Sequence, residues 1–242
     1  FPHTAMISVC IATYNGAHSI KEQLTSILSQ LGPEDEVIVS DDGSTDRTLE
    51  IVRNLSSPIV KIVEGPATGS LIDNFEHALK HASGDYIFLS DQDDKWLPNK
   101  VSIAMEHFTQ GYNCIISDCI VTDQSWNVTS PSFYQTLGKR NSRWFNLLVR
   151  NAYLGCCMAF DRSVLNRSLP FPPNIPMHDI WIGNVASFTG KVAFIDDKLI
   201  LFRRHDSNNS STASRSPYKW QDKLRFRWQT AYPLLLRILH LQ

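Results

Sequence analysis

Short apolar runs alternate with amphipathic stretches along the first half of the chain. The apolar runs have the length of strands and cover residues 7–12, 36–40, 59–63, 86–90 and 114–117. Between them, apolar residues recur at the spacing of one helix face over residues 20–31, 49–55, 71–82 and 101–108. Strands that alternate with helices indicate crossover units, so we expect an α/β fold with a Rossmann-like, mainly parallel sheet flanked by helices.

The pattern weakens in the second half of the chain. Residues 122–143 are polar and aromatic with few periodic positions, so they predict a long loop. Helices are expected near residues 144–149 and 178–188, followed by strands at 191–195 and 198–203. The stretch 207–217 is rich in serine and asparagine and predicts a flexible loop.

The last stretch of the sequence, 218–242, predicts an amphipathic carboxyl-terminal helix. It combines five Lys and Arg residues with Trp220, Phe226, Trp228 and Tyr232. A basic and aromatic helix of this kind can lie on an anionic membrane surface. The alternative, which the sequence favours, is a helix that packs on the domain or that belongs to a longer chain.

Composition and charge exclude several classes of function. The net charge of −1 and the lack of a long basic block give no indication of nucleic-acid binding. The five cysteines are odd in number and show no metal-binding spacing, which favours free thiols in a reducing compartment. No apolar run reaches about 18 residues, and no signal peptide is recognisable. We therefore expect a cytoplasmic protein, at the inner face of the cell membrane if the last helix binds lipid.

A strand that we expect to be buried runs directly into a cluster of carboxylates. Residues 86–90 are followed by Asp91, Gln92, Asp93 and Asp94. Like charges this close raise each other's pKa. A divalent cation relieves the repulsion, because hard cations take oxygen ligands and bridge to phosphates. The sequence therefore indicates a metal and a nucleotide-bound substrate, although a solvated acidic turn would look the same.

Two other predicted strands also end in polar turns. Residues 13–16 follow the first strand, and the acidic stretch 41–46 follows the second. Ligands in open α/β sheets bind beyond the carboxyl ends of the strands. The agreement of three such turns is more specific than any one of them.

These three turns resemble those of family 2 glycosyltransferases of the GT-A fold. The match rests on residues 8–15, 40–46 and 90–94, and it continues to Lys100. The run Ser-Asp-Gln-Asp-Asp-x-Trp-Leu-Pro is most similar to rhamnosyltransferase-type members that build bacterial surface polysaccharides. The resemblance covers roughly residues 6–206. It implies a nucleotide-sugar-binding half over residues 6–118 and an acceptor half over 119–206.

The resemblance implies binding roles for the first two turns. Thr13, Tyr14 and Asn15 would lie beside the nucleoside of a pyrimidine nucleoside diphosphate sugar. Asp42 matches the carboxylate that accepts a hydrogen bond from the pyrimidine N3–H, a donor that uracil and thymine have and cytosine lacks. An aspartate here could instead cap the next helix, and one of the neighbouring acids can cap while another binds.

The third turn carries the metal site of the family. By resemblance, Asp93 is the direct ligand of Mg²⁺ or Mn²⁺, and Asp91 faces the ribose or the sugar. Both ions suit oxygen ligands and a diphosphate. His205 matches a late position in the family and would bind the metal or the diphosphate, while a structural role is equally consistent with a lone histidine.

The acceptor half supplies the candidate catalytic base. Asp179 matches the acid that opens a helix in the family, and His178 before it is typical of the rhamnosyltransferase-type members. A helix amino terminus would keep Asp179 ionised and ready to take a proton, whereas an ordinary helix-opening aspartate is the alternative. Asn151 and Gly155 resemble the family's acceptor-side segment, and together with His178 they are the predicted acceptor-binding residues.

Taken together, the resemblance predicts an inverting, metal-dependent glycosyltransferase. The favoured donor is dTDP-L-rhamnose, and the acceptor is a hydroxyl of a growing surface polysaccharide or lipid-linked glycan. A UDP-hexose donor and a non-catalytic nucleotide-sugar-binding domain are the alternatives. A sugar-nucleotide pyrophosphorylase is disfavoured, because the turn after the first strand lacks the Gly-rich, Arg-containing loop of that class.

Overall fold

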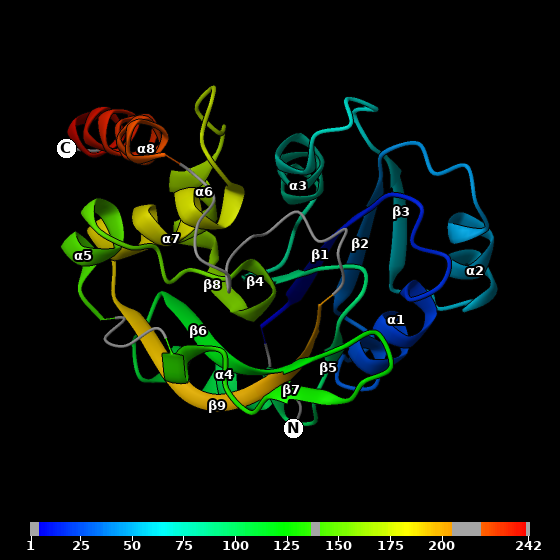
Figure 1. Ribbon diagram of the computed structural model, residues 1–242. Coiled ribbons are helices and arrows are strands. Elements are labelled where there is room, and N and C mark those ends of the chain that lie inside the picture. Colours follow the sequence, from blue (N-terminus) through cyan, green and yellow to red (C-terminus); the bar gives the residue numbers. More distant parts are fainter. Residues whose placement is uncertain (1–4, 137–140, 205–218, 241–242) are drawn as a thin grey trace.

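One curved sheet of nine strands organises the residues that the computed structural model describes, which are 5–136, 141–204 and 219–240 (Figure 1). The strands are β1 (Ile7–Thr13), β2 (Glu36–Asp41), β3 (Val60–Glu64), β4 (Tyr86–Ser90), β5 (Lys95–Trp96), β6 (Cys114–Thr122), β7 (Val128–Ser130), β8 (Met158–Asp161) and β9 (Val192–Arg203). Their order across the sheet is β3-β2-β1-β4-β8-β6-β9-β5, with β7 paired to β6. The predicted positions 207–217 and His205 lie outside the described residues.

The sheet is mainly parallel, as predicted. Strands β3, β2, β1 and β4 are parallel neighbours, and β6 and β9 also pair in parallel. Strand β8 joins these two groups, because it pairs antiparallel to β4 on one side and to β6 on the other. A single hydrogen-bonded sheet therefore runs through both halves of the chain.

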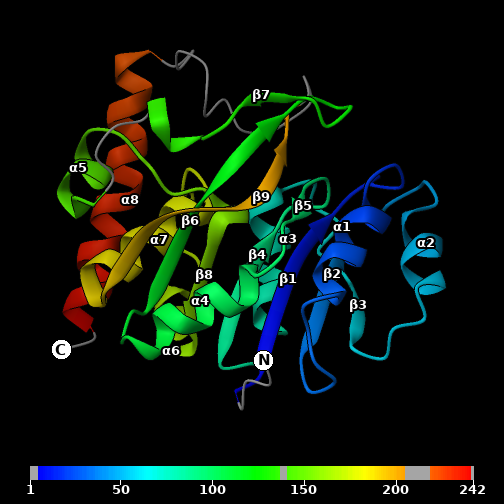
Figure 2. The ribbon, with the colours of Figure 1, turned by 90° about the horizontal axis from the view of Figure 1, so that it is seen from below.

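Helices cover both faces of the sheet. The helices are α1 (Ile20–Leu28), α2 (Thr48–Asn54), α3 (Leu71–Lys80), α4 (Lys100–Thr109), α5 (Arg143–Leu148), α6 (Arg162–Ser168), α7 (His178–Thr189) and α8 (Trp220–His240). Figures 1 and 2 show α3, α6 and α7 on one face and α1 and α4 on the other. Helix α8 is the predicted carboxyl-terminal helix and packs on the outer side of α7. Within the described ranges, no helix is long and apolar enough to span a membrane.

The central strands form because their side chains are buried on both faces of the sheet. All seven residues of β1 are buried, and β2 is buried along its whole length. Parallel strands between two helix layers read as continuous apolar runs, which is the pattern that the sequence shows. Because β1, β2 and β4 are parallel, their carboxyl ends lie together at one edge of the buried core.

A buried carboxylate ties the opposite edge of the sheet together. Glu36, 1% exposed, accepts hydrogen bonds from the Ser8 hydroxyl (2.6 Å) and the Ser83 backbone N–H (2.6 Å), and it pairs with Lys61 (2.5 Å). Burial alone would raise the pKa of Glu36, but the hydrogen bonds from Lys61, Ser8 and Ser83 outweigh it and hold the pKa below its usual value. One side chain thus links β1, β2, β3 and the turn before β4.

Two expectations for the second half are wrong, and two elements there were not predicted. The predicted loop over residues 122–143 contains strand β7 and a 3₁₀ turn at Tyr134–Thr136, and β6 extends to Thr122. The two strands expected at 191–195 and 198–203 are one continuous strand, β9, in which the exposed positions 196–198 interrupt the apolar pattern. Strand β8 and helix α6 were not predicted at all. Both are short, and neither has a periodic pattern long enough to recognise.

Candidate active site

The polar turns of the first half of the chain face the start of α7 across one cavity of about 510 Å³. Its lining combines the ends of β1, β2 and β4 with Gly155, which opens the 3₁₀ turn Gly155–Cys157, and with the first residues of α7. Of the sequence-predicted site residues, the lining includes Thr13, Tyr14, Asn15, Asp42, Asp91, Asp93, Gly155, His178 and Asp179. The fold therefore collects in one place residues that are up to 166 positions apart in the chain.

Asn151 does not line this cavity. Its side-chain oxygen accepts from the Tyr153 N–H (3.1 Å), and its amide nitrogen donates to the Tyr153 carbonyl (3.1 Å). These bonds close a tight local turn ahead of the Gly155–Cys157 segment. The observed contacts of Asn151 are thus those of a turn residue, which differs from the predicted acceptor contact.

Hydrogen bonds connect the turn after β1 to the turn after β2. Asp41 accepts from the Thr13 hydroxyl (3.0 Å) and the Ser44 N–H (2.9 Å), so it fixes the backbone of both turns. Asn15 adopts a left-handed conformation (φ 48°), and its side-chain oxygen accepts from the Thr45 N–H (2.9 Å). An Asn tolerates this conformation better than most residues. Asp41 and Asn15 therefore fix the backbone of two turns that border the cavity.

Asp42 lies beside these turns with its carboxylate at the cavity. It accepts from the Gly69 N–H (2.8 Å) and the Thr68 N–H (3.3 Å), and it is 8% exposed. It makes no cap to α2, since its partners belong to the segment before α3. The alternative that Asp42 serves as a helix cap is therefore not what the structure shows.

Gln92 is a cavity residue that the sequence reasoning missed. Its side-chain amide accepts from the Tyr14 N–H (3.1 Å) and donates to the Tyr14 carbonyl (3.1 Å). A Cβ added at Gly16 would lie 2.4 Å from the same side-chain oxygen, so a larger residue at position 16 would displace Gln92. Its position between Asp91 and Asp93 was the only sequence signal for a place in the site. A single glutamine in a turn does not by itself indicate a function.

The carboxylates of the third turn are crowded, and that of Asp94 is buried. Burial, followed by the nearby charges of Asp93 and Asp179, raises the pKa of Asp91 to about 8. Burial and the charges of Asp91 and Asp93 also raise the pKa of Asp94 well above its usual value. The side chain of Asp94 is held in place by β9, because it accepts a hydrogen bond from the Arg203 N–H (3.0 Å). The site thus gathers carboxyl groups whose ionised form a bound cation would stabilise.

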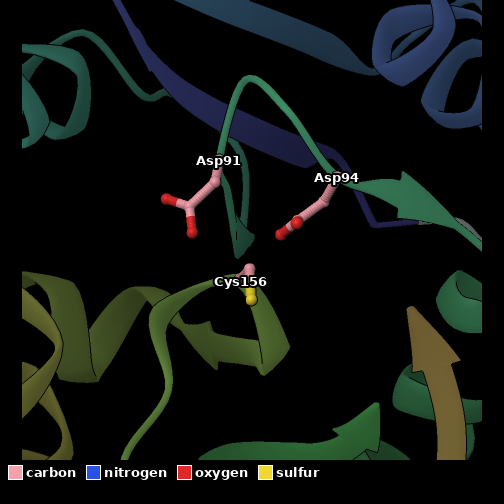
Figure 3. A group of neighbouring side chains, drawn as sticks. All are labelled: Asp91, Asp94 and Cys156. Atoms are coloured by element: carbon pink, nitrogen blue, oxygen red, sulfur yellow. The ribbon is translucent and has the colours of Figure 1, made fainter. Parts of the chain in front are cut away.

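Among the described residues, one group brings three potential metal ligands within 4.8 Å of one another, namely Asp91, Asp94 and Cys156. Figure 3 shows the two aspartates at the ends of the β4–β5 turn, with Cys156 on the facing segment. A hydrogen bond with Cys157, burial and the neighbouring acids keep the pKa of Cys156 well above its usual value, so its thiol stays protonated. Mg²⁺ and Mn²⁺ prefer oxygen ligands. The carboxylates fit such an ion, whereas the thiol does not.

Asp179 opens α7 and faces the acidic turn. One carboxylate oxygen accepts from the Gly155 N–H (3.0 Å) and the other from the Ile180 N–H (2.7 Å). Burial raises the pKa of Asp179 to about 6, which outweighs these backbone hydrogen bonds. Burial thus opposes the effect of the helix terminus on Asp179, but the carboxylate is still mostly ionised at pH 7.

His178 is buried beside Asp179, with only 3% of its surface exposed. Its ring stacks on Phe75 with 3.9 Å between centroids, and within the described chain neither ring nitrogen has a hydrogen-bond partner. Burial lowers the pKa of His178 to about 3, so the ring is neutral at pH 7. A Cβ at Gly155 would lie 3.0 Å from the Nε2 atom. The neutral His178 ring, which can both donate and accept a hydrogen bond, therefore borders the cavity next to Asp179.

The sequence pattern of the family described as "Glycosyl transferase family 2" matches residues 8–169. The dTDP-rhamnosyl transferase RfbG of Shigella flexneri is 30% identical over an alignment of 238 residues, which covers 90% of this chain and 80% of that protein. The Escherichia coli UDP-Glc:alpha-D-GlcNAc-diphosphoundecaprenol beta-1,3-glucosyltransferase WfgD is 28% identical over 69% of this chain, which spans 64% of WfgD.

Solved structures share the fold at lower identity. TarS 1–349 of S. aureus in complex with UDP-GlcNAc superimposes with a TM-score of 0.71 at 21% identity, covering 92% of this chain and 65% of that one. The mannosyltransferase PcManGT of Pyrobaculum calidifontis, in complex with GDP-Man and Mn²⁺, gives 0.64 at 21% identity, covering 98% and 69%. On the match over two thirds of its length and the shared architecture, the chain belongs to glycosyltransferase family 2.

Proposed function

We propose that this protein is an inverting glycosyltransferase that transfers L-rhamnose from dTDP-L-rhamnose to a hydroxyl of a growing glycan. The main support for the transfer reaction is that Asp179 and the turn of Asp91 and Asp93 line the same cavity and face each other. The choice of donor is supported by the 30% identity to a protein named as a dTDP-rhamnosyl transferase.

The nucleoside would bind over the first two turns. Thr13, Tyr14 and Asn15 line this end of the cavity, and Asp42 offers a carboxylate oxygen to the N3–H of thymine or uracil. The two backbone N–H groups that hold Asp42 fix the direction of that oxygen before the base arrives. A preordered acceptor favours uracil or thymine over cytosine, because the N3 atom of cytosine is itself an acceptor and cannot donate to the carboxylate.

Asp93 and Asp91 would hold Mg²⁺ or Mn²⁺ against the donor diphosphate. Both line the cavity, whereas Asp94 is 1% exposed and is engaged with the backbone of β9. A bound cation supplies Lewis-acid stabilisation of charge on the departing diphosphate. The raised pKa of Asp91 fits this assignment, since like charges surround a carboxylate that a cation would stabilise in its ionised form.

Asp179 would act as the general base. It accepts the proton of the acceptor hydroxyl while that oxygen forms a bond to the anomeric carbon and the bond to the diphosphate oxygen breaks. The electron pair of the broken bond leaves with the nucleoside diphosphate, and the configuration inverts in one displacement. A base with a pKa near 6 combines an ionised state at neutral pH with useful basicity.

The acceptor would lie on the α7 side of the cavity. The unpartnered nitrogens of His178 can contact a sugar hydroxyl there, and Gly155 leaves room for that ring. A hydroxyl of a surface polysaccharide or lipid-linked glycan is the proposed acceptor, since the glucosyltransferase WfgD is named for a diphosphoundecaprenol substrate. The same relative supports a UDP-hexose as the second candidate donor.

The first experiment is a thermal-shift measurement with Mn²⁺ and a panel of UDP, dTDP, GDP, CDP and ADP. A ligand that binds only the folded state raises the melting temperature by mass action. We expect dTDP and UDP to stabilise the protein in a metal-dependent way, and CDP not to do so. A preference for GDP would overturn the role of Asp42. No response to any pyrimidine diphosphate would favour the alternative of a non-catalytic domain. Stabilised samples are then assayed for transfer from dTDP-L-rhamnose and from UDP-glucose.

A further inference from the structure

Large apolar side chains are exposed on one part of the surface. Of thirteen such side chains among the described residues, eleven belong to α8, to α5 or to the residue that follows α5. They are Trp144, Phe145, Leu148, Val149, Trp220, Leu224, Trp228, Tyr232, Leu235, Leu236 and Leu239. We name this set the α5–α8 surface. Exposed apolar side chains that gather in one large patch typically mark an interaction site.

The apolar positions of α8 form a stripe on the side of the helix that points away from the protein. Leu224, Trp228, Tyr232, Leu235 and Leu239 follow each other at steps of three or four residues, which places them on one helix face. Thr230 and Leu234, on the opposite face, are each 2% exposed. The rings of Trp228 and Tyr232 stack with 5.5 Å between centroids, so the stripe is ordered.

Specific contacts fix the orientation of this helix. The guanidinium of Arg237 donates to the carbonyls of Arg167 (3.0 Å), Leu169 (2.8 Å) and Pro170 (2.7 Å), and it lies over the ring of Trp181 in α7. Rotating α8 to hide the stripe would break these bonds. The stripe is therefore held outward by the fold.

Helix α5 extends the apolar stripe to a second element. Arg227 of α8 donates to the carbonyl of Val149, which joins the two helices. Trp144 is 56% exposed, yet its ring is held edge-on against Phe188 of α7. Figure 2 shows α5 beside α8 along one side of the molecule. The two helices thus present a common surface that no single stretch of sequence contains.

The charge around this surface is basic. The segments 143–150 and 219–240 carry seven Lys and Arg residues, of which Arg227 and Arg237 bind carbonyls of the protein itself, and one acid, Asp222, whereas the whole chain has a net charge of −1. A second copy of this chain would bring like charges together, which disfavours self-association through this face. Trp and Tyr beside Lys and Arg match the headgroup region of an anionic bilayer, where aromatic rings insert and basic groups meet phosphates.

We propose that the α5–α8 surface binds the plane of an anionic lipid membrane. Its apolar side chains enter the headgroup and acyl boundary, and its basic side chains contact lipid phosphates. Because α8 packs on α7, which begins with His178 and Asp179, membrane binding would hold the catalytic base one helix layer from the bilayer. This proposal concerns a surface outside the cavity and does not depend on which sugar is transferred.

The test is co-sedimentation of the full chain with vesicles of phosphatidylcholine alone and with about 30% phosphatidylglycerol added. We expect binding to the anionic vesicles and much weaker binding to the neutral ones. Trp228→Glu with Leu235→Glu should reduce the partition coefficient about tenfold or more, since each buries less apolar area and adds a negative charge. Val128→Glu is the matched control, because Val128 is 60% exposed on β7, outside the surface.

A second pair of variants tests the charge. Arg150→Glu with Arg225→Glu, both exposed, should weaken binding to the anionic vesicles about tenfold or more, and added salt should act in the same direction. Lys21→Glu with Arg53→Glu, on α1 and α2, makes the same charge change elsewhere and should leave binding unchanged. All variants should keep the melting temperature and the nucleotide-induced shift of the wild-type protein, which separates this proposal from the enzymatic one.

Three results would overturn the membrane proposal. The first is a wild-type protein that stays in solution with both kinds of vesicle. The second is equal vesicle binding by the Trp228→Glu, Leu235→Glu variant and the Val128→Glu control. The third is a wild-type dimer that the stripe variant dissociates, because the surface would then be the contact between two copies of this chain.

Discussion

Asp179 illustrates how a residue's surroundings decide its chemistry. It opens a helix, which favours the ionised form, but its burial favours the neutral form and wins, so the pKa is raised to about 6. If Asp179 is the base, the rate of transfer should be constant above pH 7 and fall about tenfold per unit well below pH 6. The measurement is the pH profile of kcat at saturating donor, with the melting temperature followed over the same range.

Asp179→Asn should lower kcat by about 100-fold or more without preventing nucleotide binding. Because the pKa is higher in the folded chain than in the unfolded chain, ionisation of Asp179 destabilises the folded state as the pH rises from about 4 to 6. The Asn variant should therefore be no less stable than the wild type at pH 7. Undiminished turnover in this variant would remove Asp179 from the role of base.

Gln92 provides a second prediction at this scale. Replacing it with alanine frees the backbone of Tyr14 on both sides, so we expect the KM for the donor to rise about tenfold with a smaller change in kcat. Gln30→Ala is a matched control, because Gln30 also holds two backbone groups, the Leu97 carbonyl and the Val101 N–H, away from the cavity. Equal effects of the two variants on KM would show that Gln92 does not order the donor site.

At the scale of elements, the sheet depends on contacts that are remote in sequence. Glu36→Ala removes the acceptor shared by Ser8, Ser83 and Lys61, and it leaves buried donors unpaired. We expect a loss of about 3 kcal/mol in the free energy of unfolding, measured by urea denaturation at pH 7.

The pH dependence of this loss identifies its cause. The pKa of Glu36 is lower in the folded chain, so its carboxylate stabilises the fold above about pH 4.5, and this contribution disappears as the pH falls. The difference between the wild type and Glu36→Ala should therefore shrink below pH 4.5. Glu36→Gln keeps the shape of the side chain, and a loss equal to that of alanine would point to charge alone.

The elements that the sequence misjudged are those fixed by long-range pairing. Asp118 accepts from the backbone N–H groups of Phe133 (3.1 Å) and Tyr134 (3.2 Å), which orders a stretch that has no periodic pattern of its own. Strand β8 is four residues long and forms because β4 and β6 flank it on both sides. Neither feature leaves a local signal, because the partners lie far away in the chain.

At the scale of the whole molecule, the two halves share one sheet. A fragment that ends at Asp118 would keep only the first part of β6, without its partners β8 and β9, and would lose one neighbour of β4, exposing apolar strand edges. We expect a fragment of residues 1–118 to aggregate or to lack fixed tertiary structure in near-ultraviolet circular dichroism. The full chain should unfold in one cooperative transition. A monomeric fragment with native-like spectra would show that the halves are separate folding units.

The sequence by itself determined the parts of this protein that rest on local patterns. Buried parallel strands require apolar runs, and ligand-binding turns require polar residues directly after them, so the α/β fold, the three turns and the family could be recognised from residues 8–94. The tertiary structure decided what depends on distance in space. It raised the pKa of Asp179 through burial, placed Gln92 on Tyr14, left Asn151 outside the cavity and joined α5 to α8 in one apolar and basic surface. Desolvation and packing depend on every neighbouring element, and a linear pattern does not record them.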